Sequence, residues 1–271
     1  MPAPNLYCSL PDLKTRIGEA TTTYDAPLLL LLEAVSRAVD AYTNRFFYVV
    51  TETRYYDGAG RRLLLDQDLI SVATLKTDDN DDGVYEATWA STDYDLLPYN
   101  APHKVLVAVR RAGTKHDFNP GLTKTVEVVG TWGYADAVDA SGATINEGGT
   151  YSASDTTLTV SSGAAFKTGQ TLRIESEQLY VSAISGNNLT VTRGVNGTTA
   201  ATHADGTAIS ILAHPRAVAE ATLQQAALIW ARRAAGFIAP TSPLLSGPLP
   251  DLDPHIRGLL LPFRRVTFAR V

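Results

Sequence analysis

Residues 25–45 read DAPLLLLLEAVSRAVDAYTNR, and this stretch predicts a long amphipathic helix. Its apolar side chains recur at spacings of three and four residues, which is the period of a helix that buries one stripe. The stripe consists of Leu28, Leu31, Leu32, Val35, Val39 and Tyr42. Asp25 can cap the helix with Pro27 in its first turn, and Thr43-Asn44-Arg45 is its expected end.

A shorter helix is expected directly before this stretch. Ser9 can cap it, Pro11 and Asp12 suit its first turn, and Gly18 can end it. Downstream of the long helix, β-branched and aromatic runs predict a mainly antiparallel sheet or sandwich. The expected strands cover residues 49–56, 62–65, 70–76, 93–98, 105–111 and 125–132.

Residues 143–212 differ in composition from the rest of the chain, because serine, threonine, glycine and asparagine dominate there. Short apolar or alternating runs separated by turn residues predict a small all-β module. Its expected strands cover residues 157–160, 171–175, 179–184, 189–192 and 208–211. The module interrupts an otherwise single pattern, so we interpret it as an insertion between a strand and the last helix.

The chain after the module begins with an alanine-rich helix over residues 214–236. Prolines in residues 239–254 predict an extended arm, and residues 264–268 predict a short strand. Together these elements predict an α+β protein with a helical core, antiparallel strands and a small all-β inserted domain. The expected domains are a core over residues 1–142, the module over 143–212, and a long helix with a C-terminal arm over 213–271.

Composition and charge limit the class of protein. The 271 residues include one cysteine, Cys8, so no disulfide can form within the chain, which fits a reducing cytosol. The net charge of −5 is unevenly spread, with −7 in residues 1–142, −2 in 143–212 and +4 in 213–271. An acidic body argues against bulk binding of nucleic acid. The basic end allows head-to-tail matching between copies or with a partner, and chance clustering on a solvated surface is the alternative.

No segment of the sequence predicts a targeting signal or a membrane span. The longest apolar run, residues 28–32, is far shorter than the roughly 20 residues that cross a bilayer. The first ten residues also lack a charged region followed by an apolar one. We therefore expect no contact with a membrane.

The sharpest motif is Asp78-Asp79-Asn80-Asp81-Asp82-Gly83, which matches the first half of a calcium-binding loop. The twelfth position of such a loop supplies a bidentate glutamate, and here it is Trp89. The flanking residues predict strands, whereas calcium loops of this kind join helices. We therefore expect an acidic hairpin tip, and no metal or other cofactor.

No arrangement of nucleophile and base is present in the sequence. It contains neither a G-x-S-x-G elbow nor a phosphate loop, and none of the five histidines has the spacing of a zinc site. The glycine-rich run at residues 57–62 could hold a phosphate, but a hairpin turn with exposed arginines is the ordinary interpretation. Two basic pairs, Arg232-Arg233 and Arg264-Arg265, could contact an acidic surface or DNA phosphates, or simply be solvated. These observations predict that the protein is not an enzyme.

Two stretches resemble the opening of the phage head-tail connector family, whose members are also called adaptor or head completion proteins. They are LPDLKTRI over residues 10–17 and APLLLLLEAVSRAVDAYTNRFF over residues 26–47. Members of the family begin with a short helix and a long helix whose exit is similar to Tyr42-Thr43-Asn44-Arg45. Residues 84–96 and the long helix at 214–236 are also similar. The resemblance covers residues 1–142 and 213–271, whereas the insert at 143–212 departs from the small members.

The resemblance implies a helical connector core and a structural role in the virion. Subunits of the family form a ring, commonly of twelve copies, that docks on the portal and joins the DNA-filled head to the tail. The implied partners are the portal protein, a tail or neck protein, further copies of this chain, and viral DNA that passes through the channel without sequence-specific binding. The implied location is the head-tail junction of the virion, after assembly in the host cytoplasm.

The C-terminal tail is the expected portal contact. The resemblance suggests that this tail reaches into the portal, and an extended arm with a short strand suits β-augmentation, in which backbone hydrogen bonds supply affinity. The predicted contact residues are Arg264, Arg265, Val266, Thr267 and Phe268. Like-charge repulsion between the acidic body and DNA would keep DNA from adhering to the channel wall.

Two other classes of function stay open at this point. A virion decoration protein, or a receptor- or glycan-binding module, would rest on the Ser/Thr-rich insert at residues 143–212, which would then bind a glycan or the capsid on its own. A hydrolase with an unrecognised site would require a pocket with convergent titratable groups. The connector predicts ring oligomers and a C-terminal arm that docks.

Overall fold

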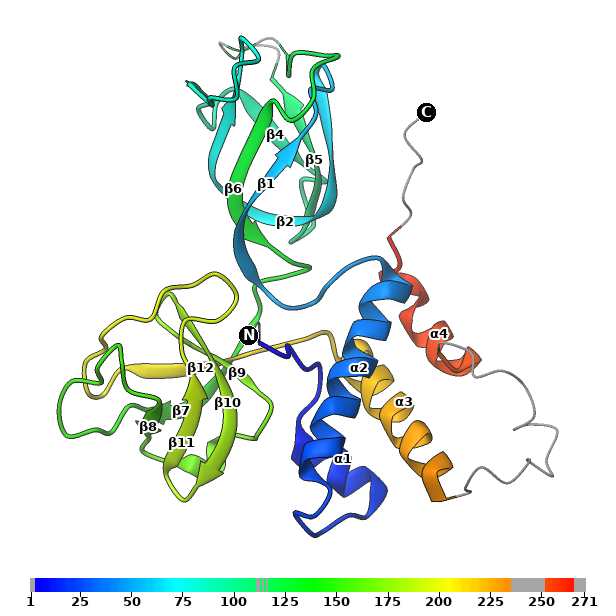
Figure 1. Ribbon diagram of the computed structural model, residues 1–271, viewed down its shortest axis with the longest axis vertical. Helices are drawn as coiled ribbons and strands as arrows, with labels where there is room; N and C mark the ends of the chain where they lie inside the picture. Colours follow the sequence, from blue (N-terminus) through cyan, green and yellow to red (C-terminus); the bar gives the residue numbers. More distant parts are fainter. Residues whose placement is uncertain (1–2, 111–112, 114, 116, 235–251, 266–271) are drawn as a thin grey trace. The chain divides into compact units, whose positions relative to one another are not determined.

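A computed structural model describes residues 3–265 apart from 111–112, 114, 116 and 235–251. The chain forms two compact units, one of Met1–Phe46 with Ala137–Val271 and one of Phe47–Asp136 (Figure 1). Among the described residues, strands, arranged in two six-stranded antiparallel sheets, hold 34% and helices hold 24%. The predicted helical connector core is therefore wrong, because strands dominate and each sheet buries apolar residues of its own.

The unit of Phe47–Asp136 is built on one antiparallel sheet in the order β1-β6-β2-β5-β4, with β3 paired to β2. The strands are β1 Val50–Tyr56, β2 Arg62–Thr77, β3 Ala87–Thr88, β4 Tyr94–Leu97, β5 Lys104–Val109 and β6 Val126–Trp132. Alternate side chains of β6 are buried, which is the pattern of a strand with one face in the core. Leu63, Leu75 and Trp132 are at most 1% exposed in that core.

β2 is a single strand where the sequence predicted two. Its first half pairs with β5 through Leu64 and Leu106, and its second half pairs with β6 through Leu75 and Val128. The register shifts between these halves, so the strand is irregular in its polar middle without ending there. The polar residues 66–68 therefore mark an irregularity within one strand and not a turn.

The second sheet belongs to the other unit and has the order β7-β12-β9-β10-β11-β8. Its strands are β7 Val138–Thr144, β8 Thr157–Thr159, β9 Thr171–Ile174, β10 Glu177–Ser185, β11 Asn188–Thr192 and β12 Ala208–Leu212, with a 3-10 turn, η1, at Gly163–Ala165. We call β7 to β12 the β module; Leu158, Leu172 and Leu189 lie in its core. All five strands expected within residues 143–212 form, and β7 begins before that range.

The described helices also belong to this unit: α1 Leu10–Ile17, α2 Asp25–Thr43, α3 Arg216–Ala234 and α4 Pro254–Leu260, which is followed by a 3-10 turn, η3, at Leu261–Phe263. The predicted ends of α1 are confirmed, since the Asp12 N–H donates to the Ser9 hydroxyl and Gly18 has a left-handed φ of 71°. α2 ends as predicted at Asn44, which also has a left-handed φ. Its cap is Tyr24, one residue before the predicted Asp25.

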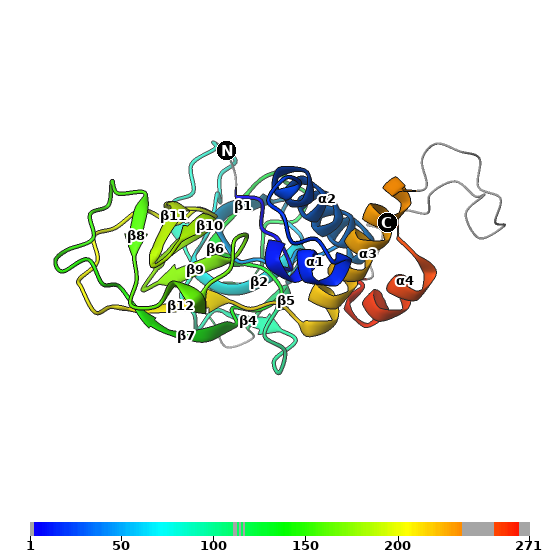
Figure 2. The same cartoon turned by 90° about the horizontal axis from the view of Figure 1, so that it is seen from below.

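α1, α2 and α3 lie side by side and share one apolar core, as Figure 1 and Figure 2 show. The buried residues of this core are Leu6, Leu10, Leu13, Leu28, Leu32, Val35 and Ala226. The predicted stripe of α2 is buried except at Leu31 and Tyr42, which are partly exposed. Ser36, which the sequence placed largely on the opposite side, is fully buried and donates to the Leu32 carbonyl at 2.7 Å. None of the described helices is long and apolar enough to cross a membrane.

The segment before α1, residues 3–9, is held against α2 by polar contacts. The Tyr7 N–H donates to Ser36 Oγ at 3.2 Å. The Arg37 guanidinium donates to the Asn5 carbonyl at 3.0 Å and lies 5.6 Å from the centre of the Tyr7 ring. Because most of its residues are buried, we call this segment the N-terminal strap.

The strap contacts the β module on its other side. The side chains of Asn5 and Asn196 exchange two hydrogen bonds of 2.9 Å. A small apolar cluster nearby consists of Ala3, Tyr180 and Val195. The Leu10 N–H, at the start of α1, donates to the Thr168 carbonyl at 3.1 Å. The strap therefore ties the helices to the β module within one unit.

The C-terminal region contains a helix where the sequence predicted part of an extended arm. Asp253 caps α4 by accepting a hydrogen bond from the His255 N–H at 2.9 Å, and Pro254 lies in the first turn. Leu252, Ile256 and Leu260 are buried, and α4 packs on α3 and α2. Apolar residues four apart thus form a helix here, because the proline starts it instead of preventing it.

Neighbouring leucines at the end of α4 allow a matched test of this helix. Leu260 is fully buried, whereas Leu261 is 61% exposed. We expect Leu260→Ala to lower the free energy of unfolding by about 2–5 kcal/mol, because it leaves a cavity. Leu261→Ala should change it by about 0.5 kcal/mol or less. Urea unfolding followed by circular dichroism measures both values, and equal losses would contradict the packing of α4.

Candidate functional site

The acidic motif forms the loop of a hairpin between β2 and β3, as predicted. Asp78 is 2% exposed, and its carboxylate accepts hydrogen bonds from the backbone N–H groups of residues 80–83. The bonds from Asp81 and Gly83 are the shortest, at 2.7 Å. The loop therefore has a defined shape, built around one buried carboxylate.

Oxygens of Asp78, Asp82 and Glu86 in this loop lie within 4.8 Å of one another, which is a spacing that a cation could use. The N–H groups around Asp78, however, direct their positive ends at its oxygens, where a cation would compete with them. Although desolvation opposes the change, these hydrogen bonds lower the pKa of Asp78. Trp89, at the twelfth position, is buried and stacks on Phe118 with ring centres 4.5 Å apart. The geometry favours a preformed acidic turn over a calcium loop.

Exposed apolar side chains lie beside the acidic groups. Val84 of the loop is 59% exposed, and Tyr55 of β1 is 46% exposed. The rings of Tyr55 and Tyr85 lie 5.5 Å apart, and the Lys124 ammonium lies 4.7 Å from the Tyr55 ring. We define the acidic tip by its exposed residues Asp79, Asp81, Asp82, Val84 and Glu86.

Arg264 and Arg265, the first two predicted portal-contact residues, contact the C-terminal end of α2. The Arg265 N–H donates to the Thr43 carbonyl at 2.8 Å, and the Arg264 guanidinium lies 5.7 Å from the Tyr42 ring. Neither arginine is in a strand, so the predicted strand does not include these two positions. The other three predicted contact residues, Val266, Thr267 and Phe268, lie outside the described residues.

More cationic and apolar groups gather around Tyr42. Its hydroxyl donates to the Arg257 carbonyl at 3.4 Å, and the Arg264 N–H donates to the Leu261 carbonyl at 3.1 Å. Among the described residues, no carboxylate pairs with the guanidinium of Arg257 or Arg264. We define the basic patch as Arg257, Leu261, Pro262 and Arg264.

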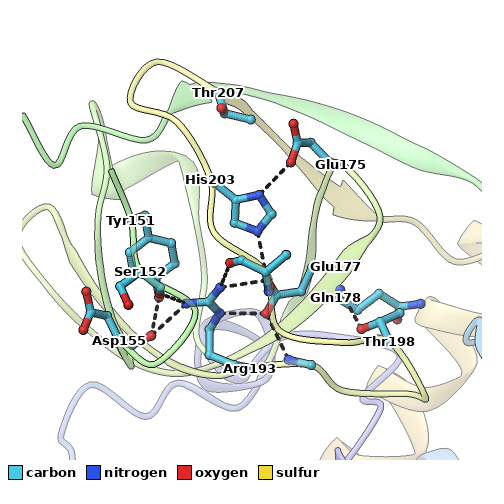
Figure 3. Close-up of polar contacts among 12 residues, drawn as sticks. Tyr151, Ser152, Asp155, Glu175, Glu177, Gln178, Arg193, Thr198, His203 and Thr207 are labelled. Atoms are coloured by element: carbon cyan, nitrogen blue, oxygen red, sulfur yellow. Dashed lines mark hydrogen bonds and ion pairs between the residues drawn. The ribbon is translucent and has the colours of Figure 1, made fainter. Parts of the chain in front are cut away.

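The densest polar network lies in the β module, and nothing in the sequence predicted it (Figure 3). Glu177 of β10 and Arg193 form a two-pronged ion pair in which both N–O distances are 2.7 Å. The two ring nitrogens of His203 lie 2.8 Å from the carboxylates of Glu175 and Glu177. The side chains of Glu177, Arg193 and His203 are at most 6% exposed. The only available signal was the scarcity of charged residues in residues 143–212.

The polar groups of this network form their hydrogen bonds with other groups of the protein. Arg193 also donates to backbone carbonyls of Ser152, Asp155 and Ala201. Burial alone would raise the pKa of Glu177, but Arg193, two backbone N–H groups and His203 lower it to about 2. The carboxylate is therefore charged and fully bonded at neutral pH, which suits a structural ion pair and not a general base. The network holds residues 193–203 on the sheet.

The thiol of the single cysteine is protonated at neutral pH, which makes it a poor nucleophile. Burial, and then the negative charges of Asp12 and Glu220, raise the pKa of Cys8 to about 12. The thiol therefore stays protonated at neutral pH, whereas the thiolate is the reactive form. A cavity of about 340 Å³ lies beside Cys8 and His214, and His214 packs edge-on against Tyr7 with ring centres 4.9 Å apart. This arrangement does not form a thiolate–imidazole pair.

Comparisons with protein-family models, with curated proteins and with solved structures found no match to this chain. Its function is therefore inferred from residues and geometry.

The pH dependence of stability tests the network in the β module. Because the pKa of Glu177 is lowered from 4.5 to about 2, its charge stabilises the fold fully above pH 4.5 and progressively less as the pH falls toward 2. We expect Glu177→Gln to remove this acid-sensitive contribution. At pH 7 it should also cost about 3 kcal/mol, because it leaves Arg193 buried without its charge partner.

Glu175→Gln is the matched control, since Glu175 contacts the other nitrogen of His203 but its side chain is 63% exposed. Urea unfolding at pH 7 and pH 3 measures both variants. Equal behaviour of the two variants at both pH values would contradict a structural role for the buried pair.

Hydrogen exchange tests the shape of the acidic loop. Asp78→Ala removes the acceptor of four backbone N–H groups, so we expect the amides of residues 80–83 to exchange at least about tenfold faster. Asp81→Asn should leave these rates unchanged, because asparagine also tolerates the left-handed φ of 63° at that position. Mass spectrometry of peptides that span the loop measures the rates. Unchanged exchange in Asp78→Ala would show that Asp78 does not order the loop.

Proposed function

We propose that this protein is a structural part of a virion, a ring-forming connector that docks on the portal and joins the DNA-filled head to the tail. The observation that carries the proposal is the shared core of α1, α2 and α3. These helices lie in three of the stretches that resemble connector proteins, residues 10–17, 26–47 and 214–236, and two β regions separate α2 from α3 along the chain. The proposal therefore rests on the similar sequences and on the packing of the helices that contain them, and not on a helical core for the whole protein.

The course of the C-terminal residues supports portal docking. Arg265 is bonded through its backbone to Thr43, and Arg264 lies over Tyr42, so the described part of the chain ends beside the exit of α2. That exit, Tyr42-Thr43-Asn44-Arg45, is one of the stretches that resemble connector proteins. We propose that the contact is made by Arg264, Arg265, Val266, Thr267 and Phe268, the last three by adding backbone hydrogen bonds to a portal sheet.

The remaining parts of the proposal concern the assembly. The ring would contain about twelve copies, would sit at the head-tail junction between portal and tail or neck protein, and would be assembled in the host cytoplasm. DNA would pass through its channel without sequence-specific contacts, because the acidic body repels phosphate. The structural use of Glu177, Arg193 and His203, and the protonated thiol of Cys8, support a role without catalysis.

The β module bears on the alternative function, a decoration or receptor-binding module. Its contacts with Asn5 of the strap and with Leu10 of α1, and an ion pair of 2.6 Å between Lys167 and Asp12, attach it to the helices. A module that acts on its own would need no such attachment. These contacts support its inclusion in the body of the connector.

Electron microscopy with the portal protein of the same virus tests the proposal. We expect the full chain to form a ring stacked on the portal, and a copy that ends at Arg265 to lose this docking while it keeps its circular dichroism spectrum. Ending the chain at Arg265 keeps the buried residues of α4, so loss of docking would not reflect unfolding. Failure of the full chain to associate with the portal at any concentration would contradict the connector, and binding of the isolated β module to glycan or capsid would favour the alternative.

A further inference from the structure

The acidic tip and the basic patch each combine exposed apolar side chains with charged ones, and the two charges are opposite. The tip presents four carboxylates around exposed Val84, beside exposed Tyr55. The patch presents two arginines around exposed Leu261 and Pro262. An apolar centre with a polar or charged rim is the usual anatomy of a protein interface.

The charges of the tip are available for an intermolecular contact. Within the described residues, Asp81, Asp82 and Glu86 pair with no lysine or arginine, and Asp79 has only a long contact of 3.9 Å with Lys115. The bonds to Asp78 fix the loop before any partner arrives. A preformed loop loses little conformational entropy on binding, which favours affinity.

The arginines of the patch are also available for an intermolecular contact. No described carboxylate neutralises Arg257 or Arg264, and Tyr42 holds both residues in place through its hydroxyl and its ring. The sequence shows the same division, since residues 1–142 carry −7 and residues 213–271 carry +4. Each copy therefore carries one surface of each sign.

We infer that the acidic tip of one copy docks on the basic patch of the next. The inference rests on the proposed ring and identifies a contact within it. A contact between two different surfaces of identical subunits is heterologous, and it closes into a ring when the rotation between neighbours allows. Every copy then gives one tip and receives one, so each tip and each patch in the closed ring has a partner of opposite charge.

A contact of this kind depends on salt. Complementary charges at an interface are screened as the Debye length falls from about 10 Å at 0.1 M salt to about 3 Å at 1 M salt. We therefore expect assembly of the protein, alone or on the portal, to weaken at least about tenfold across this range. The apolar centre at Val84 and Leu261 would supply the part of the affinity that salt does not remove.

Charge exchange between two variants tests the inference. The tip variant carries Asp82→Lys with Glu86→Lys, and the patch variant carries Arg257→Glu with Arg264→Glu. Each variant alone brings like charges together, so we expect each to associate at least about tenfold more weakly than the wild-type chain. An equal mixture should restore rings in which the two variants alternate, because every contact in such a ring again joins opposite charges.

Sedimentation velocity and electron microscopy, with and without the portal, measure assembly of the four samples. A combined variant with all four substitutions should also assemble, and Arg216→Glu, which reverses an exposed charge at the start of α3, is the control that should assemble as wild type does. Circular dichroism confirms folding of each variant. Restoration in the mixture would support the contact between copies.

The other outcomes separate this inference from the proposed function. Rings formed normally by both single-surface variants would overturn the contact and leave the connector standing. Rescue in the combined variant but not in the mixture would place the contact within one chain and overturn the inference. Because Arg264 is also a proposed portal contact, the patch variant is judged by the rings it forms without the portal. Rings that form normally but no longer bind the portal would assign the whole patch to the portal and overturn the contact between copies. A wild-type chain that forms no ring even with the portal would contradict the connector itself.

Discussion

The buried stripe of α2 organises the unit that contains the helices. α1 and α3 pack against it, α4 contacts its C-terminal half, and the N-terminal strap is bonded to Ser36 and Arg37 on the same helix. Burying a leucine or valine completely contributes about 1.5–3 kcal/mol. Leu28, Leu32, Val35 and Val39 are each at most 2% exposed, so this helix contributes more apolar burial than the short helices around it. The position of Arg265 depends on the same helix, because its N–H donates to the Thr43 carbonyl at the end of α2.

Local rules predicted the elements that carry their own signals. The cap at Ser9, the left-handed Gly18 and Asn44, and the alternation in the β module gave helices and strands close to their observed positions. Local signals did not predict that sheets, and not helices, would dominate the fold. The strands of residues 50–132 form a sheet that buries apolar side chains of its own, among them Leu63, Leu75 and Trp132. Helices at both ends of the sequence therefore did not imply a helical core.

The candidate sites also divide into those that local sequence signals predicted and those that depend on contacts between distant residues. The acidic hairpin followed from the missing glutamate at Trp89 and from the flanking strands, and the structure adds the buried carboxylate of Asp78 that shapes it. The ion pair of Glu177 and Arg193 joins residues from separate elements, and only the sheet pairing brings them together. The spacing of residues along a single sequence does not predict an ion pair of this kind. α4 was missed because prolines near it suggested an arm, although a proline is also favourable in a first helical turn.

The N-terminal strap has a consequence for synthesis on the ribosome. Residues 47–136 form a continuous unit that can fold as soon as it leaves the exit tunnel. The strap is made before its partners Tyr180 and Asn196 and has to wait for them, just as α2 has to wait for α3. Contacts between residues so distant in sequence form slowly, because a long loop must close first. The stripe of α2 is therefore exposed until α3 has been translated, and during this interval the nascent chain presents an apolar surface that a chaperone could cover.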